Sequence, residues 1–124
     1  MRTIITTLAL SASIFSVNTF ANFVHPMDFS GSEKEKEEVL KYIKDRVKHD
    51  YCESGVDMCQ ETTLRMMEKQ NLDAFKKASK ATDRKIMDRV ISDYCHSGVD
   101  MCSYQTISMM YDQNFKASKQ ETTW

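Results

Sequence analysis

Apolar side chains recur at every fourth position in two stretches of the chain. The positions are Val39, Ile43, Val47 and Tyr51 in the first stretch and Ile86, Val90 and Tyr94 in the second. Residues four apart lie on one face of an α-helix, and polar residues fill most of the positions between them here. The pattern therefore predicts two amphipathic helices.

A second apolar stripe follows each of these helices. Its members are Val56, Cys59, Met66 and Phe75 in the first case and Val99, Cys102, Met109 and Phe115 in the second. Beyond Ser32 the chain has no proline and only two glycines, Gly55 and Gly98, so few residues interrupt helix formation. The sequence thus predicts an all-α fold of two helical hairpins with four main helices.

The two hairpins are copies of one unit. The segment Asp-Tyr-Cys-Glu-Ser-Gly-Val-Asp-Met-Cys at 50–59 returns as Asp-Tyr-Cys-His-Ser-Gly-Val-Asp-Met-Cys at 93–102, an offset of 43 residues. From 45 to 59, 12 of 15 positions match their partners. We expect repeats at about 33–75 and 76–118 within a single domain over 33–124. The copies are expected to pack as a four-helix assembly with a pseudo-twofold relation.

The turn in each copy carries residues suited to helix capping. Ser54 precedes Asp57 by three positions, and Ser97 precedes Asp100 in the same way. A serine at the N-cap can accept a hydrogen bond from the third amide of the helix, and an acidic residue there can reach back. Alternatively, the glycine after each serine ends the preceding helix and the aspartate is the N-cap. Either interpretation predicts a tight corner between the two cysteines of each copy.

Four cysteines in a small chain favour a disulfide framework, for which three connectivities exist. A short corner brings Cys52 near Cys59 and Cys95 near Cys102, so we expect these local pairs. Each disulfide would close a short loop and stabilise the folded state by about 2.5 kcal/mol in the chain-entropy model. The spacing is too wide for the paired cysteines of a zinc site and differs from the Cys-x-x-Cys of thioredoxin-like enzymes. The cysteines are therefore interpreted as structural.

The N-terminal residues resemble a secretory signal. Arg2 precedes an uncharged, largely apolar run from Ile4 to Val17, and Thr19 and Ala21 place small residues at the −3 and −1 positions. We expect cleavage after Ala21, which makes 1–21 a signal peptide and 22–32 an N-terminal arm. The alternative is an uncleaved membrane anchor, which the Thr, Ser and Asn in this run disfavour. The expected location is periplasmic or secreted, with no membrane insertion after cleavage.

Charge and motif content narrow the range of functions. The formal net charge is −1, and a nucleic-acid partner would require clustered Lys and Arg instead. The sequence has no Gly-rich phosphate loop, no Gly-x-Ser-x-Gly and no His-Glu-x-x-His. The three histidines have no counterpart in the other copy, so a duplicated metal site is not expected. We predict that the chain is not an enzyme and holds no cofactor or metal.

Two duplicated features are candidates for partner binding. One is a set of soft, adaptable methionines, and the other is an Asp-Arg ridge. The residues concerned are Met66, Met67, Met109, Met110, Arg46 and Arg89. The sequence favours a small exported protein that binds another protein, such as an inhibitor, immunity factor or stress-related accessory protein. The alternative is a soft-metal protein that handles copper through Met and Cys side chains. The oligomeric state is left open.

Overall fold

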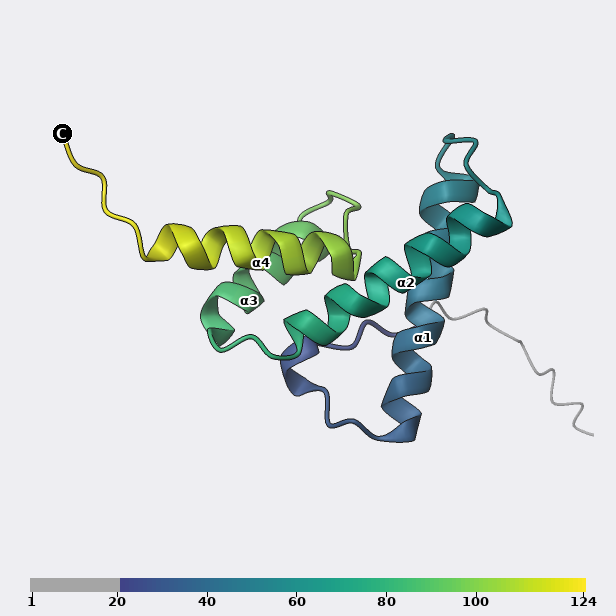
Figure 1. Cartoon of the computed structure of the whole chain (residues 1–124), viewed down its shortest axis with the longest axis horizontal. Coiled ribbons are helices and arrows are strands. Elements are labelled where there is room, and N and C mark those ends of the chain that lie inside the picture. Colours follow the sequence, from purple (N-terminus) through teal and green to yellow (C-terminus); the bar gives the residue numbers. More distant parts are fainter. Residues whose placement is uncertain (1–20) are drawn as a thin grey trace, which may run out of the picture.

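Four α-helices dominate the part of the chain that the structure describes, residues 21–124 of a computed structural model (Figure 1). They are α1 (Glu33–Lys48), α2 (Glu61–Ala78), α3 (Arg84–Cys95) and α4 (Tyr104–Ser118). A 3₁₀ turn, η1 (Pro26–Asp28), precedes them, and a π-helical turn, η2 (His49–Glu53), prolongs α1. Residues 21–124 contain no strand. The all-α prediction is confirmed, whereas the expected signal peptide lies outside the described residues apart from Ala21.

Polar side chains that were not anticipated from the sequence cap the starts of α1 and α3. At α1, the Ser32 hydroxyl accepts a hydrogen bond from the Glu35 amide at 3.2 Å. The Glu35 carboxylate in turn accepts from the Ser30 amide at 2.6 Å. The bonds from Ser30 lower the pKa of Glu35, since they stabilise its charged form. At α3, Asp83 accepts from the Ile86 amide at 3.0 Å.

The predicted capping by Ser54, Asp57, Ser97 and Asp100 is wrong, because α2 and α4 begin only after the second cysteine of each copy. The N-cap of α2 is Gln60, which has no side-chain capping bond, and that of α4 is Ser103, which accepts from the Thr106 amide. Each earlier serine closes the preceding helix instead: the Ser54 hydroxyl donates to the Asp50 carbonyl at 2.5 Å, and Ser97 makes the matching bond to Asp93.

In the first copy Gly55 directly follows the C-cap residue Ser54, as the alternative interpretation proposed, whereas in the second copy α3 already ends at Cys95 with His96 as its C-cap. Gly55 and Gly98 have φ of +83° and +85°, which a residue with a Cβ adopts only with strain. The chain then runs extended to the second cysteine. A backbone bond from the Met58 amide to the Tyr51 carbonyl holds this segment in the first copy, and the same bond joins Met101 to Tyr94. These bonds delay the start of the second helix.

The core consists of two clusters, and α4 and α2 each contribute one residue to the cluster formed mainly by the other hairpin. The first contains Val39, Tyr42, Ile43, Val47 and Phe75, with Tyr104 added from α4. The second contains Met87, Val90, Ile91, Ile107 and Tyr111, with Ala78 added from α2. The connection from α2 to α3 is short, and α2 packs against both α1 and α4. Burial of apolar area therefore joins the two copies as well as stabilising each one.

The copies do not meet as a twofold pair, which corrects the expected symmetry. Arg46 of the first copy bonds to Asp100 in the second copy's corner, with Nη1 to Oδ1 at 2.6 Å and Nη2 to the carbonyl at 2.8 Å. A twofold axis would pair Arg89 with Asp57, but Arg89 bonds to Asp93 on its own helix. The contact is therefore head-to-tail, like that between neighbours in a repeat protein.

The N-terminal arm packs along both clusters. Phe23 lies against Tyr42 and Tyr104, with ring centroids 5.4 and 5.2 Å away. The Tyr104 hydroxyl donates to the Val24 carbonyl at 2.9 Å and accepts from the Val24 amide at 3.0 Å. Burial raises the pKa of Tyr104. The arm is thus anchored to the second copy before α1 begins.

Candidate functional site

A disulfide closes each corner, as expected. Cys52 pairs with Cys59 and Cys95 with Cys102, and the Cα atoms of each pair are 4.7 Å apart. Both bridges join residues within one copy. Each therefore fixes a short loop between two helices, so the tip of the loop is held in one conformation by covalent and hydrogen bonds.

The tips of the corners expose apolar side chains. Val56 and Met58 are 46% and 47% exposed, and the matching Val99 and Met101 are 47% and 48% exposed. These four residues are identical in the two copies, yet none belongs to either core cluster. Packing therefore does not account for them. Figure 1 shows both corners projecting to the same side of the molecule.

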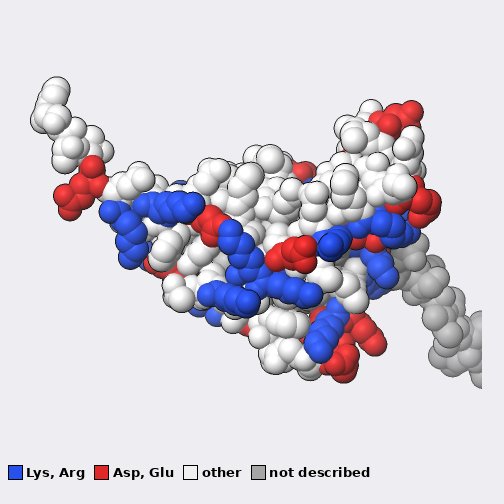
Figure 2. Space-filling view, in the orientation of Figure 1, with Lys and Arg blue, Asp and Glu red and all other residues white. Residues whose placement is uncertain are grey.

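The surface between the corners carries little charge in the view of Figure 2, whereas Lys and Arg, with Asp and Glu among them, form a charged band below it. Met66 on α2 and Met109 on α4 are 53% and 51% exposed. Their neighbours Met67 and Met110 are half-buried and pack against the first and second clusters. The four predicted methionines therefore divide into two that face solvent and two that complete the core.

The two predicted arginines differ in their surroundings. The Arg46 side chain is 12% exposed and also bonds through Nε to Asp50 at 3.1 Å. Arg89 is 79% exposed. The hydrogen bond from Arg46 lowers the pKa of Asp100, which outweighs the opposing effect of desolvation. Arg46 thus ties α1 to the second corner, while Arg89 points to solvent, so the two do not form one duplicated ridge.

The second corner is held to α1 by a further bond. The Tyr42 hydroxyl donates to the Cys102 carbonyl at 2.6 Å, and burial raises the pKa of Tyr42 to about 12. The structure records no such contact to the first corner within residues 21–124. The second tip is therefore braced against the first copy, whereas the first tip depends on its own hairpin.

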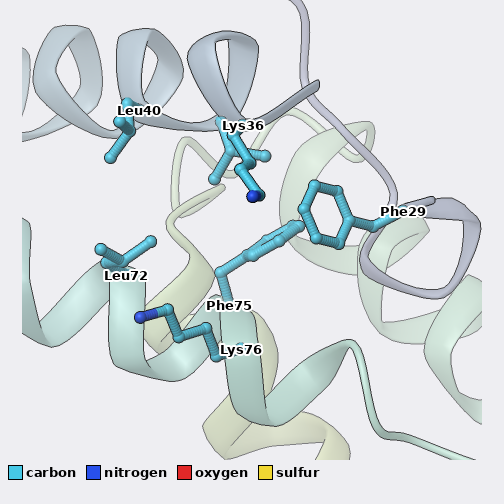
Figure 3. A pocket seen from close by; sticks show the side chains of 7 residues that line it. Phe29, Lys36, Leu40, Leu72, Phe75 and Lys76 are labelled. Atoms are coloured by element: carbon cyan, nitrogen blue, oxygen red, sulfur yellow. The ribbon is translucent and has the colours of Figure 1, made fainter. Parts of the chain in front are cut away.

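A cavity between α1 and α2 was missed by sequence analysis. It has a volume of about 290 Å³, and Figure 3 shows most of the side chains that line it. The lining residues are Phe29, Lys36, Val39, Leu40, Leu72, Phe75 and Lys76. Leu40 is 39% exposed at its edge. Leu40 on α1 and Leu72 on α2 are each an ordinary apolar residue of an amphipathic helix. The sequence alone therefore did not indicate that they line a cavity.

The cysteines offer no thiolate ligand in this structure, because all four form disulfides. In the described part of the chain, His, Cys, Asp and Glu residues form no group of three or more arranged to hold a metal ion. The copper alternative would therefore depend on the thioethers alone. On the helices, the methionines with exposed side chains are Met66 and Met109.

Comparisons with protein-family models, with curated proteins and with solved structures found no match to this chain. Among residues 21–124, none of the helices is both long and apolar enough to cross a membrane. The disulfides are consistent with an oxidising compartment.

Proposed function

We propose that the chain is an exported, non-enzymatic protein that binds another protein through the tips of its two corners. The observation that carries the proposal is the repeated pair of exposed apolar residues, Val56 with Met58 and Val99 with Met101. A solvent-facing position that serves no packing role has no structural reason to keep its identity after duplication. Exposed apolar residues grouped in this way are typical of interaction surfaces.

The geometry of the corners supports this function. Each tip lies on a loop closed by a disulfide, so little conformational entropy is lost when a partner orders it. Methionine is adaptable and suits an apolar partner surface of irregular shape. Two tips on one body also permit simultaneous engagement, which raises overall affinity without new kinds of contact.

The test compares capture of partners from the exported fraction of the source cells. We expect the wild-type protein to retain a defined partner after cross-linking, and Val56→Ser/Met58→Ser and Val99→Ser/Met101→Ser to retain it weakly. The combined fourfold variant should lose it. Trp124→Ser is the matched control, since Trp124 is also an exposed large apolar residue but lies away from the corners, at the C-terminus.

Equal capture by the wild type and the fourfold variant would overturn the proposal. Retention of Cu(I) through desalting, together with its loss in Met66→Leu and Met109→Leu, would favour the soft-metal alternative instead.

A further inference from the structure

The cavity of the first copy has apolar walls from three segments. Phe29 comes from the arm, Val39 and Leu40 from α1, and Leu72 and Phe75 from α2. Figure 3 shows the Leu40 and Leu72 side chains at one end and Phe29 at the other, with Phe75 between them. Small-molecule sites are commonly of this kind, with mostly apolar walls and a few polar groups that orient the ligand.

The polar groups here are two lysines, one on each helix. Lys36 projects from α1 and Lys76 from α2, on opposite sides of the cavity (Figure 3). Among residues 21–124, no acidic side chain lines the cavity. Lys36 meets Glu33 at 2.9 Å, but this exposed i,i+3 pair is weak. For Lys76, no ion pair is recorded within residues 21–124. The mouth of the cavity is therefore positively charged.

The wall contributed by the arm is firmly held. The Phe29 ring meets Phe75 edge to face, with centroids 5.0 Å apart. Next to it, Asp28 accepts two hydrogen bonds from Arg84, at 2.5 and 3.0 Å, and these lower the pKa of Asp28. The cavity therefore exists before any ligand arrives, which reduces the entropic cost of binding.

The duplication does not explain this cavity. At the offset of 43 residues, Lys36, Val39 and Leu40 correspond to residues 79, 82 and 83, which precede α3. The second copy thus lacks the helical turns that form one wall. The feature is confined to the first copy and depends on residues outside the shared motif.

We propose that this cavity binds a small aliphatic carboxylate, an unbranched chain of medium length with one carboxylate end. The hydrocarbon lies against Leu40, Leu72 and Phe75, and the carboxylate pairs with Lys36 and Lys76. The volume is at the lower end of the range for ligand pockets, about 300–1,000 Å³, so the ligand is small. The charge at the mouth selects a carboxylate over an alcohol of the same length.

The test is a titration of the full chain with octanoate and with octanol, in which NMR measures the amide chemical shifts at each ligand concentration. We expect saturable shifts at Leu40 and Leu72 and tighter binding of octanoate. Affinity should rise about fourfold for each methylene added from hexanoate upward, until the chain fills the cavity. An absence of saturable shifts, or shifts confined to the corners, would overturn the proposal.

Lysine variants separate the charge from the hydrocarbon. Lys36→Gln and Lys76→Gln should each weaken octanoate about two- to fivefold, the range expected for an exposed ion pair, and leave octanol unchanged. Lys44→Gln and Lys69→Gln on the same two helices are the matched controls and should bind both ligands as the wild type does. If all four variants behave alike, or if octanol binds as tightly as octanoate, the assignment is wrong.

Discussion

Arg46 and Arg89 occupy matching positions in the two copies but make different contacts. Both have an aspartate four residues later on the same stretch of helix. Only Arg46 also reaches across to another repeat, where Asp100 supplies a carboxylate and a carbonyl. The sequence identified both arginines but could not distinguish them, because the difference arises from a contact between residues 54 positions apart.

Substitution of Arg46 should therefore cost more than substitution of Arg89. We expect Arg46→Gln to lower the free energy of unfolding by about 1–2 kcal/mol, since it removes the charged hydrogen bonds from Arg46 to Asp100 and Asp50. Arg89→Gln removes an exposed i,i+4 pair and should cost less than about 0.5 kcal/mol. Urea denaturation of both variants checks this. Equal losses would show that the contact between copies contributes nothing.

The same contact predicts a dependence on pH. The pKa of Asp100 is lowered in the folded state by the bond from Arg46, so its contribution is fully present above the ordinary value of about 3.9. It is lost as the pH falls through the folded-state pKa. The melting temperature of the wild type should exceed that of Asp100→Asn most at about pH 6, and the difference should shrink below about pH 4. In an Arg46→Gln background, the difference in melting temperature between the proteins with and without Asp100→Asn should not shrink in this way as the pH falls.

At the level of elements, local patterns predicted the helices and the disulfide pairs. The spacing of Val39, Ile43 and Val47 is a property of one helix, and eight-residue corners leave little choice of pairing. The starts of α2 and α4 were misplaced because the residues up to the second cysteine stay extended, held by a bond such as that between Met58 and Tyr51. The cavity needed Phe29 beside Phe75, a distant contact that no spacing rule contains.

The arm provides a test of such distant contacts. Tyr104→Phe keeps the buried ring but removes both hydrogen bonds to Val24. We expect a loss of about 1–3 kcal/mol, because a partly buried amide and carbonyl are left unpaired. Hydrogen exchange at the Val24 amide should become markedly faster than in the wild type. Unchanged protection would mean that packing of Phe23 alone holds the arm.

At the level of the whole molecule, two positions of α1 are more polar than the matching positions of α3. Met87 and Ile91 are 0% and 7% exposed in the second cluster, which Ala78 of α2 joins. At the matching positions the first copy has Lys44 and Lys48, both exposed. Repeat arrays need polar outer faces on their terminal units. We therefore expect the two lysines to act as a cap that disfavours stacking of another copy on α1.

Removal of this cap should promote self-association. We expect Lys44→Met/Lys48→Ile to raise the weight-average mass with concentration in analytical ultracentrifugation, relative to the wild type, because it creates a new apolar patch. Lys69→Met/Lys116→Ile makes the same chemical changes on two different helices and is the matched control. Identical sedimentation of all three proteins would exclude a capping role.

Both covalent bridges lie within a copy, and only the chain between α2 and α3 joins the two copies covalently. A protease that cuts at residues 79–83 would therefore yield two oxidised fragments with no covalent bond between them. Each fragment would carry one intact corner and half of the interface, including either Arg46 or Asp100. The fragments should remain associated after cleavage, through noncovalent contacts alone. They should separate in urea without a reducing agent, and they should associate again when the urea is removed.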